Sequence, residues 1–118
     1  MINIKRIYDE PADGDGQRIL VDRLWPRGVS KERAAIDLWL KEIAPSPELR
    51  VWFNHQPERF AEFRQKYLDE LAENPAVTTL QTKQTEGGNV TLLYAAKDPK
   101  INHAAVLKEY LEQGTPSG

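Results

Sequence analysis

The chain of 118 residues contains no cysteine. Without cysteine there are no disulfides, no thiol catalysis and no zinc or iron–sulfur sites with cysteine ligands. No apolar run approaches the roughly 20 residues of a membrane-spanning helix. Residues 1–6 alternate in polarity and lack the apolar core of a signal peptide. We therefore expect a cytoplasmic protein with no membrane partner.

Composition and length predict one globular domain. The hydrophobic fraction is 40% and the charged fraction is 29%, which is typical of a folded domain rather than a disordered one. A chain of this length is enough for one domain and too short for two ordinary ones. We expect a single α/β domain over residues 1–113 and a flexible C-terminal tail over residues 114–118.

Positive charge is unevenly distributed, although the net charge is only −2 and gives no overall attraction to nucleic acid. All eight arginines lie in the first 64 residues, and residues 18–33 carry five basic side chains against two acidic ones. The fork of a guanidinium suits a carboxylate or a phosphate. This segment is either an anion site or a solvated charged face, and both interpretations stay open here, nucleic acid included.

Periodicity and capping signals predict the order of elements. Apolar patterns predict strands at residues 2–7, 18–24, 36–40 and 90–95. Helix signals predict one short turn capped by Ser30 and four helices, near residues 46–54, 57–73, 75–86 and 102–112. Phe60, Phe63, Tyr67 and Leu71 form one apolar stripe. Residues 13–16 are expected to be a plain turn, since the downstream glutamate of a calcium loop is missing.

This order predicts a small three-layer α/β domain with a mostly parallel sheet of three or four strands flanked by helices. The pairing of the first two strands does not fit a simple parallel arrangement, because the loop between them is short for a parallel crossover. We expect these two strands to be either antiparallel or not adjacent.

Polar side chains follow two of the predicted strands. Asp22, Arg23, Trp25 and Arg27 come after one strand, and Lys97, Asp98, Asn102 and His103 come after the other. The carboxyl ends of parallel strands meet at one edge of a sheet, where α/β domains usually bind ligands. We therefore expect these side chains to converge at that edge.

Their chemistry suggests two kinds of role. Arg23, Arg27, Trp25, Lys97 and Asn102 are the candidate ligand-binding residues for a phosphate or carboxylate, helped by the helix start near residue 102. Asp22, Asp98 and His103 are the candidate proton-transferring, catalytic residues.

Each candidate also has a structural alternative. Asp22 could hold a neighbouring arginine or a loop amide, Asp98 could cap a turn, and His103 could simply pack. No metal is predicted, because a site would need Asp22, Asp98, His55 and His103 gathered together. The sequence identifies no cofactor.

Several segments carry a family resemblance. They are RILVDRLWPRGVSK at 18–31, WLKEIAPS at 39–46, ELR at 48–50 with WFNH at 52–55, and VTLLYAAKD at 90–98 with NHA at 102–104. Together they resemble the YeaO-like proteins, a bacterial and archaeal domain of unknown function in the DUF 488 superfamily. The resemblance covers nearly the whole chain and implies one compact, cytosolic α/β domain, without implying an established activity.

Longer relatives in that superfamily carry a Cys-x-Glu…Cys-His-Arg stretch. The corresponding positions here are Tyr94, Ala96 and residues 102–104, so both cysteines, the glutamate and the final arginine are absent. A thiol, metal or redox role in those relatives is therefore not carried over to this chain. Asp22, Arg23 and His103 are what the resemblance retains.

The leading hypothesis is a small-ligand domain, with catalysis left open, that holds an anionic ligand near Arg23, Arg27 and His103. One rival is a protein or nucleic-acid interaction module that uses the basic segment 18–33, and another is a structural domain with an ion-pair network. A concave pocket holding Arg23 and His103 would favour the first. A flat basic face that includes Lys31 and Arg33 would favour the second. The substrate and the oligomeric state do not follow from the sequence.

Overall fold

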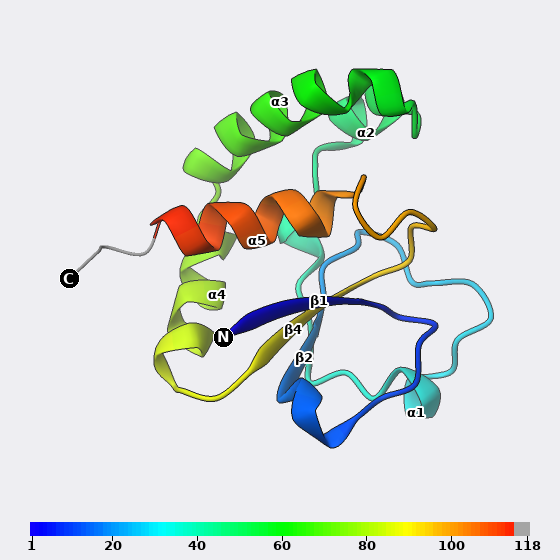
Figure 1. Ribbon diagram of the computed structural model, residues 1–118, viewed down its shortest axis with the longest axis vertical. Helices are drawn as coiled ribbons and strands as arrows, with labels where there is room; N and C mark the ends of the chain where they lie inside the picture. The colour runs from blue at the N-terminus through cyan, green and yellow to red at the C-terminus, as the bar shows by residue number, and fades with distance from the viewer. Residues whose placement is uncertain (115–118) are drawn as a thin grey trace.

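A computed structural model describes residues 1–114 and contains a sheet of four parallel strands in the order β1-β4-β2-β3 (Figure 1). The strands are β1 (Ile2–Arg6), β2 (Gln17–Leu20), β3 (Leu38–Trp39) and β4 (Val90–Tyr94). The α-helices are α1 (Lys31–Ala34), α2 (Pro47–Phe53), α3 (Phe60–Ala72), α4 (Ala76–Thr85) and α5 (His103–Gly114). Three single 3₁₀ turns join them, η1 (Asp13–Asp15), η2 (Lys41–Ile43) and η3 (Pro57–Arg59). The predicted α/β class with a parallel sheet is confirmed.

The last strand in the chain, β4, lies at the centre of the sheet between β1 and β2. All five of its residues are buried, as expected for a parallel strand covered on both faces. Leu92 of β4 pairs with Ile4 on one side and with Ile19 on the other. The first two strands are therefore parallel but not adjacent, which is one of the two alternatives that the short loop predicted.

The predicted starts of α1 and α2 are confirmed by their capping contacts. The Ser46 hydroxyl accepts a hydrogen bond from the Leu49 amide, and Pro47 occupies the first turn of α2. Ser30 caps α1 in the same way by accepting from the Arg33 amide. At the other end of α2, Asn54 adopts a left-handed conformation (φ 47°), which stops the helix and turns the chain toward α3.

One face of the sheet carries the main hydrophobic core, which the four longer helices supply. Ile19, Leu92 and Tyr94 face this core, and the stripe on α3 meets them through Phe63 and Tyr67. The Tyr67 hydroxyl donates to the Ile43 carbonyl at 2.7 Å, and burial raises the pKa of this phenol well above its usual value. Helix α5 contacts both β1 and β4 and packs against α3 (Figure 1). The apolar stripe predicted for α3 thus lies in the main core, where α3 packs against α5 and α2.

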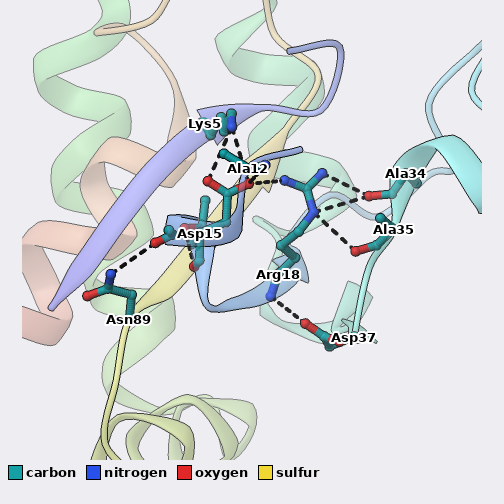
Figure 2. Close-up of polar contacts among 10 residues, drawn as sticks. Lys5, Ala12, Asp15, Arg18, Ala34, Ala35, Asp37 and Asn89 are labelled. Atoms are coloured by element: carbon teal, nitrogen blue, oxygen red, sulfur yellow. Dashed lines mark hydrogen bonds and ion pairs between the residues drawn. The ribbon is translucent and has the colours of Figure 1, made fainter. Parts of the chain in front are cut away.

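The opposite face is covered by the one-turn helix α1 and by loops. Leu20 and Leu93 lie there with Val29 and Ala34. This smaller core is completed by a polar group, which we call the Arg18 cluster and which consists of Lys5, Asp15, Arg18 and the carbonyls of Ala34 and Ala35 (Figure 2).

Arg18 is the centre of that cluster and is only 5% exposed. Its guanidinium pairs with the Asp15 carboxylate and donates to the carbonyls of Ala34 at 2.8 Å and Ala35 at 3.1 Å. Residues 18–33 therefore do not form one continuous basic face, because the first arginine of the segment is buried beneath α1.

Several predicted boundaries differ from the structure. The strand predicted at 18–24 ends at Leu20, and the helix predicted from residue 57 begins at Phe60, after the 3₁₀ turn η3. The third strand is shorter than the predicted 36–40, since only Leu38 and Trp39 pair with β2. Helix α5 extends to Gly114, and the rest of the predicted tail, residues 115–118, lies outside the described residues. Among the helices of residues 1–114, none is both long enough and apolar enough to cross a membrane.

Candidate functional site

A cavity of about 700 Å³ opens at the carboxyl edge of the sheet. Every candidate residue from the two strand ends lines it, namely Asp22, Arg23, Trp25, Arg27, Lys97, Asp98, Asn102 and His103. The topology explains this convergence, because β2 and β4 are adjacent and parallel and both chains leave the sheet at the same edge. The structure therefore brings together the residues that the sequence separates by up to 81 positions.

Asp22 and His103 contact each other at the floor of this cavity. His103 Nε2 lies 3.1 Å from Asp22 Oδ1 and 3.0 Å from the Val21 carbonyl oxygen. Since both neighbours are acceptors, Nε2 carries the proton. The ring is held further by Tyr67, which lies edge-on at 6.2 Å between centroids. This arrangement leaves His103 Nδ1 without a hydrogen-bond partner within residues 1–114.

Asp22 is fixed by the backbone rather than by an arginine. Its Oδ2 accepts a hydrogen bond from the Ala95 amide at 2.9 Å, which ties the end of β2 to the end of β4. Its Oδ1 is buried and makes no hydrogen bond of good geometry, even though His103 Nε2 is close to it. The predicted alternative of a loop-amide contact is therefore present, and an ion pair with Arg23 or Arg27 is not.

The Arg23 side chain is anchored at one end only. Its terminal Nη2 donates to the carbonyls of Ala44 at 3.3 Å and Pro45 at 3.4 Å, and its Nε is buried without a partner. Arg27 and Lys97 are exposed, and neither side chain has a hydrogen bond or an ion pair within the described part of the chain. The Arg23 Nε donor and the Arg27 and Lys97 cations are thus not committed to protein acceptors.

Asp98 and Asn102 shape the loop that follows β4. Asp98 Oδ1 accepts from the amides of Lys100 at 2.8 Å and Ile101 at 2.9 Å, and these hydrogen bonds lower the pKa of this exposed carboxyl. Asn102 caps α5 by accepting from the Ala105 amide, and it donates to the Asp98 carbonyl, both at 2.8 Å. The turn-capping alternative for Asp98 therefore describes its observed contacts.

Trp25 forms a fixed apolar wall. Its indole N–H donates to the Val29 carbonyl at 2.7 Å, and its ring lies edge-on to Trp39 with centroids 5.4 Å apart. Trp39 in turn donates to the Asp22 carbonyl at 2.8 Å. Because the indole donor is used within the loop, Trp25 can offer a ligand its ring surface but no hydrogen bond.

Sequence reasoning missed the second wall of the cavity, which α2, η3 and α3 build. Arg50 lines this wall and was not a candidate, and His55 lines it although the sequence named this histidine only in a metal site that is not predicted. Asn54 and His55 both have positive φ values, 47° and 53°, and this turn brings His55 to the cavity. Arg50 belongs to a family segment, but nothing in that segment indicates a cavity, because packing of α2 on α3 rather than strand order places Arg50 there.

The lining has an excess of positive charge. Arg23, Arg27, Arg50 and Lys97 line the cavity together with two carboxylates, Asp22 and Asp98. Within residues 1–114 those carboxylates bond to backbone amides or to His103, and none of the four cations pairs with either of them. In the same described part, no group of three or more histidine or carboxylate side chains could hold a metal ion.

Comparison with known proteins identifies relatives over nearly the whole chain. The model of the DUF488-N3i family, described as the inactive DUF488-N3 subclade, matches residues 1–117. The uncharacterized protein YeaO of Escherichia coli (strain K12) is 46% identical over 110 residues, which is 93% of this chain and 96% of that protein. The uncharacterized protein Rv3073c of Mycobacterium tuberculosis (strain ATCC 25618 / H37Rv) is 43% identical over 110 residues, 93% of this chain and 92% of that protein. No solved structure matches the chain.

Proposed function

The chain belongs to the DUF488-N3i family, and from that premise we propose that it is a binding domain for a small anionic ligand, a phosphate or a carboxylate. The ligand binds at the carboxyl edge of the sheet, near Arg23, Arg27 and His103. One observation carries the proposal: Arg27, Arg50 and Lys97 all line one cavity and have no side-chain partner within residues 1–114. Cations gathered around a concavity attract an anion more strongly than cations dispersed over a surface do.

The hydrogen-bonding groups of the site suit an anion as well. A guanidinium can bind a carboxylate or phosphate through two parallel hydrogen bonds, and the exposed guanidiniums of Arg27 and Arg50 line the cavity beside Arg23. Helix α5 begins at His103 beside the cavity. The positive end of its dipole favours negative charge there, although Asn102 already caps the Ala105 amide of the first turn.

The proposal is for binding without catalysis. The two candidate carboxylates have structural partners, since Asp22 and Asp98 accept from backbone amides, and His103 Nε2 faces the Val21 carbonyl, which leaves Nδ1 as the uncommitted nitrogen of that ring within residues 1–114. The description of the family as an inactive subclade supports the same choice. An interaction surface on residues 18–33 is less favoured, because Arg18 is buried. A cytoplasmic location stays a prediction.

A thermal-shift titration tests this function. Inorganic phosphate, simple carboxylates and nucleotides are compared with chloride at matched ionic strength, and a ligand that binds only the native state raises Tm. We expect Arg23→Ala to abolish the rise, and Arg23→Lys to restore little of it, because an ammonium cannot reproduce the guanidinium fork. Lys31→Ala, on the exposed face of α1, is the matched control and should keep the full response.

Two results together would contradict the proposal. No anion would shift Tm beyond the chloride control, and Arg23→Ala would lower the stability of the ligand-free protein. Arg23 would then be a structural anchor for the carbonyls of Ala44 and Pro45 and not a ligand-binding residue.

A further inference from the structure

The cavity is larger and more apolar than an inorganic anion requires. Its volume of about 700 Å³ falls within the range that holds drug-sized ligands, roughly 300–1,000 Å³. Between the cations the lining is apolar and includes Leu24, Trp25, Phe53, Pro57, Phe63 and Ile101. Phe53 and Phe63 are already buried in the core, but a phosphate or carboxylate alone would leave the exposed Leu24 and the half-buried Trp25 uncovered.

Leu24 is the clearest sign that something apolar covers this lining. It is 61% exposed and, with Met1 and Val51, is one of three exposed large hydrophobic residues within residues 1–114. Of these three, Leu24 lines the cavity, and it directly follows Arg23. Covering a leucine side chain of this exposure is worth about tenfold in affinity.

One part of the cavity lining is aromatic and rigid. Trp25 is fixed by its hydrogen bond to Val29 and by its edge contact with Trp39. Phe53 also lines the cavity but is only 6% exposed, and its ring stacks on Phe63 in the core with centroids 4.3 Å apart. Rings held in one orientation favour a flat partner that can stack on them or meet their edges.

The unpartnered guanidiniums point to the same kind of ligand. Arg27 and Arg50 are exposed, and within the described residues neither side chain has a protein partner. A guanidinium can stack on the face of an aromatic ring as well as pair with an anion. An aliphatic ligand would use only the second of these two interactions.

We propose that the natural ligand is an aromatic anion, a flat ring that carries a phosphate or carboxylate. This inference rests on the proposed function, which concerns the charged group of the ligand, and it specifies the rest of the ligand molecule. The anionic group binds near Arg23 and the start of α5, and the ring lies against Trp25 and Leu24.

Calorimetric titration with three probes tests the proposal, namely inorganic phosphate, phenyl phosphate and cyclohexyl phosphate. We expect phenyl phosphate to bind at least tenfold more tightly than inorganic phosphate and severalfold more tightly than cyclohexyl phosphate. Leu24→Ser should weaken phenyl phosphate about tenfold and leave inorganic phosphate unchanged. Val51→Ser, which alters an exposed apolar residue outside the cavity (73% exposed), is the matched control and should change neither affinity.

The outcomes separate this inference from the function beneath it. If inorganic phosphate binds and phenyl phosphate is no tighter, the aromatic ligand is wrong while anion binding stands. If cyclohexyl phosphate equals phenyl phosphate, the ring is not recognised and the proposal also fails. If none of the three probes binds, anion binding itself is wrong, and this inference is overturned with it.

Discussion

Replacing Arg18 by methionine should be among the most damaging single changes to this fold. Methionine keeps most of the side-chain volume and removes the guanidinium, which pairs with Asp15 and donates to the carbonyls of Ala34 and Ala35. Helix α1 has only four residues and cannot be stable by itself, because a single helical turn lacks enough hydrogen bonds to offset its ordering cost. The substitution therefore leaves the buried Asp15 carboxylate without its arginine partner and removes the hydrogen bonds that hold the end of α1.

The structure sets the size of the expected loss. Removing one partner of a buried ion pair costs about 3–5 kcal/mol. Lys5 Nζ remains 3.2 Å from Asp15 Oδ2. Because the Asp15 carboxylate keeps this partner, the cost of losing its Arg18 partner lies near the lower end of that range. The unpaired Ala34 carbonyl adds about 1 kcal/mol. We expect Arg18→Met to lose about 4 kcal/mol of unfolding free energy, a large share of the roughly 5–15 kcal/mol of a typical domain.

Urea unfolding followed by circular dichroism measures this loss. Arg33→Met is the matched control, because it also replaces an arginine by methionine. Arg33 lies on α1, is exposed, and donates to the Tyr8 carbonyl at 3.2 Å. The control should lose less than about 1 kcal/mol. A loss below about 1 kcal/mol for Arg18→Met as well would refute the view that this guanidinium holds α1 on the sheet.

Three further predictions concern the core, a tight turn and acid stability. Phe63→Ala should cost about 3–5 kcal/mol in the same urea assay, since Phe63 is 2% exposed in the main core; a loss under about 1 kcal/mol would mean that the α3 stripe does not anchor the core. Gly16→Ala should prevent folding or cost more than about 3 kcal/mol, because Gly16 has φ 66° and an added Cβ would lie 2.1 Å from the Asn89 carbonyl oxygen. Gly28→Ala, at φ 74° in open space, should cost only about 1 kcal/mol, and equal losses at the two glycines would contradict the steric explanation. Burial acts to raise the pKa of Asp15, but hydrogen bonds from the Ala12 amide, Lys5 and Arg18 outweigh it and hold the pKa below its usual value. The stability that Asp15 contributes is therefore present above about pH 4 and is lost as the pH falls further. The difference in unfolding free energy between the parent and Asp15→Asn should shrink from pH 5 to pH 2. A difference that stays constant over this range would contradict the prediction.

Local signals in the sequence were sufficient for much of the fold. Ser46 before Pro47 fixes the start of α2 through contacts within one turn, so the sequence predicts it without tertiary information. The stripe through Phe63 and Tyr67 follows from helical periodicity in the same way. The strand order was beyond such reasoning, because the central position of β4 depends on pairings about 90 residues apart, such as Ile2 with Val90.

The candidate site likewise contains residues that local signals and strand order predict and residues that only tertiary packing places there. The parallel strand ends predicted the meeting of Asp22 with His103, because only topology at one sheet edge was needed. Arg50 was missed, since it reaches the cavity through the packing of one helix on another. Neither interpretation of the basic segment, an anion site or a solvated face, predicts the burial of Arg18, because a run of charges does not indicate that a helix covers its first member.

The central position of β4 has a consequence for how the protein is made. Leu20 pairs with Leu93, and synthesis of the 72 residues between them takes about 4–14 s at roughly 5–20 residues per second. During that interval β1 and β2 exist without the strand that joins them, and their hydrogen-bonding edges are open to other chains. The nascent chain is thus most exposed to aggregation just before residue 90 emerges, and slow codons upstream of that point would lengthen the dangerous period.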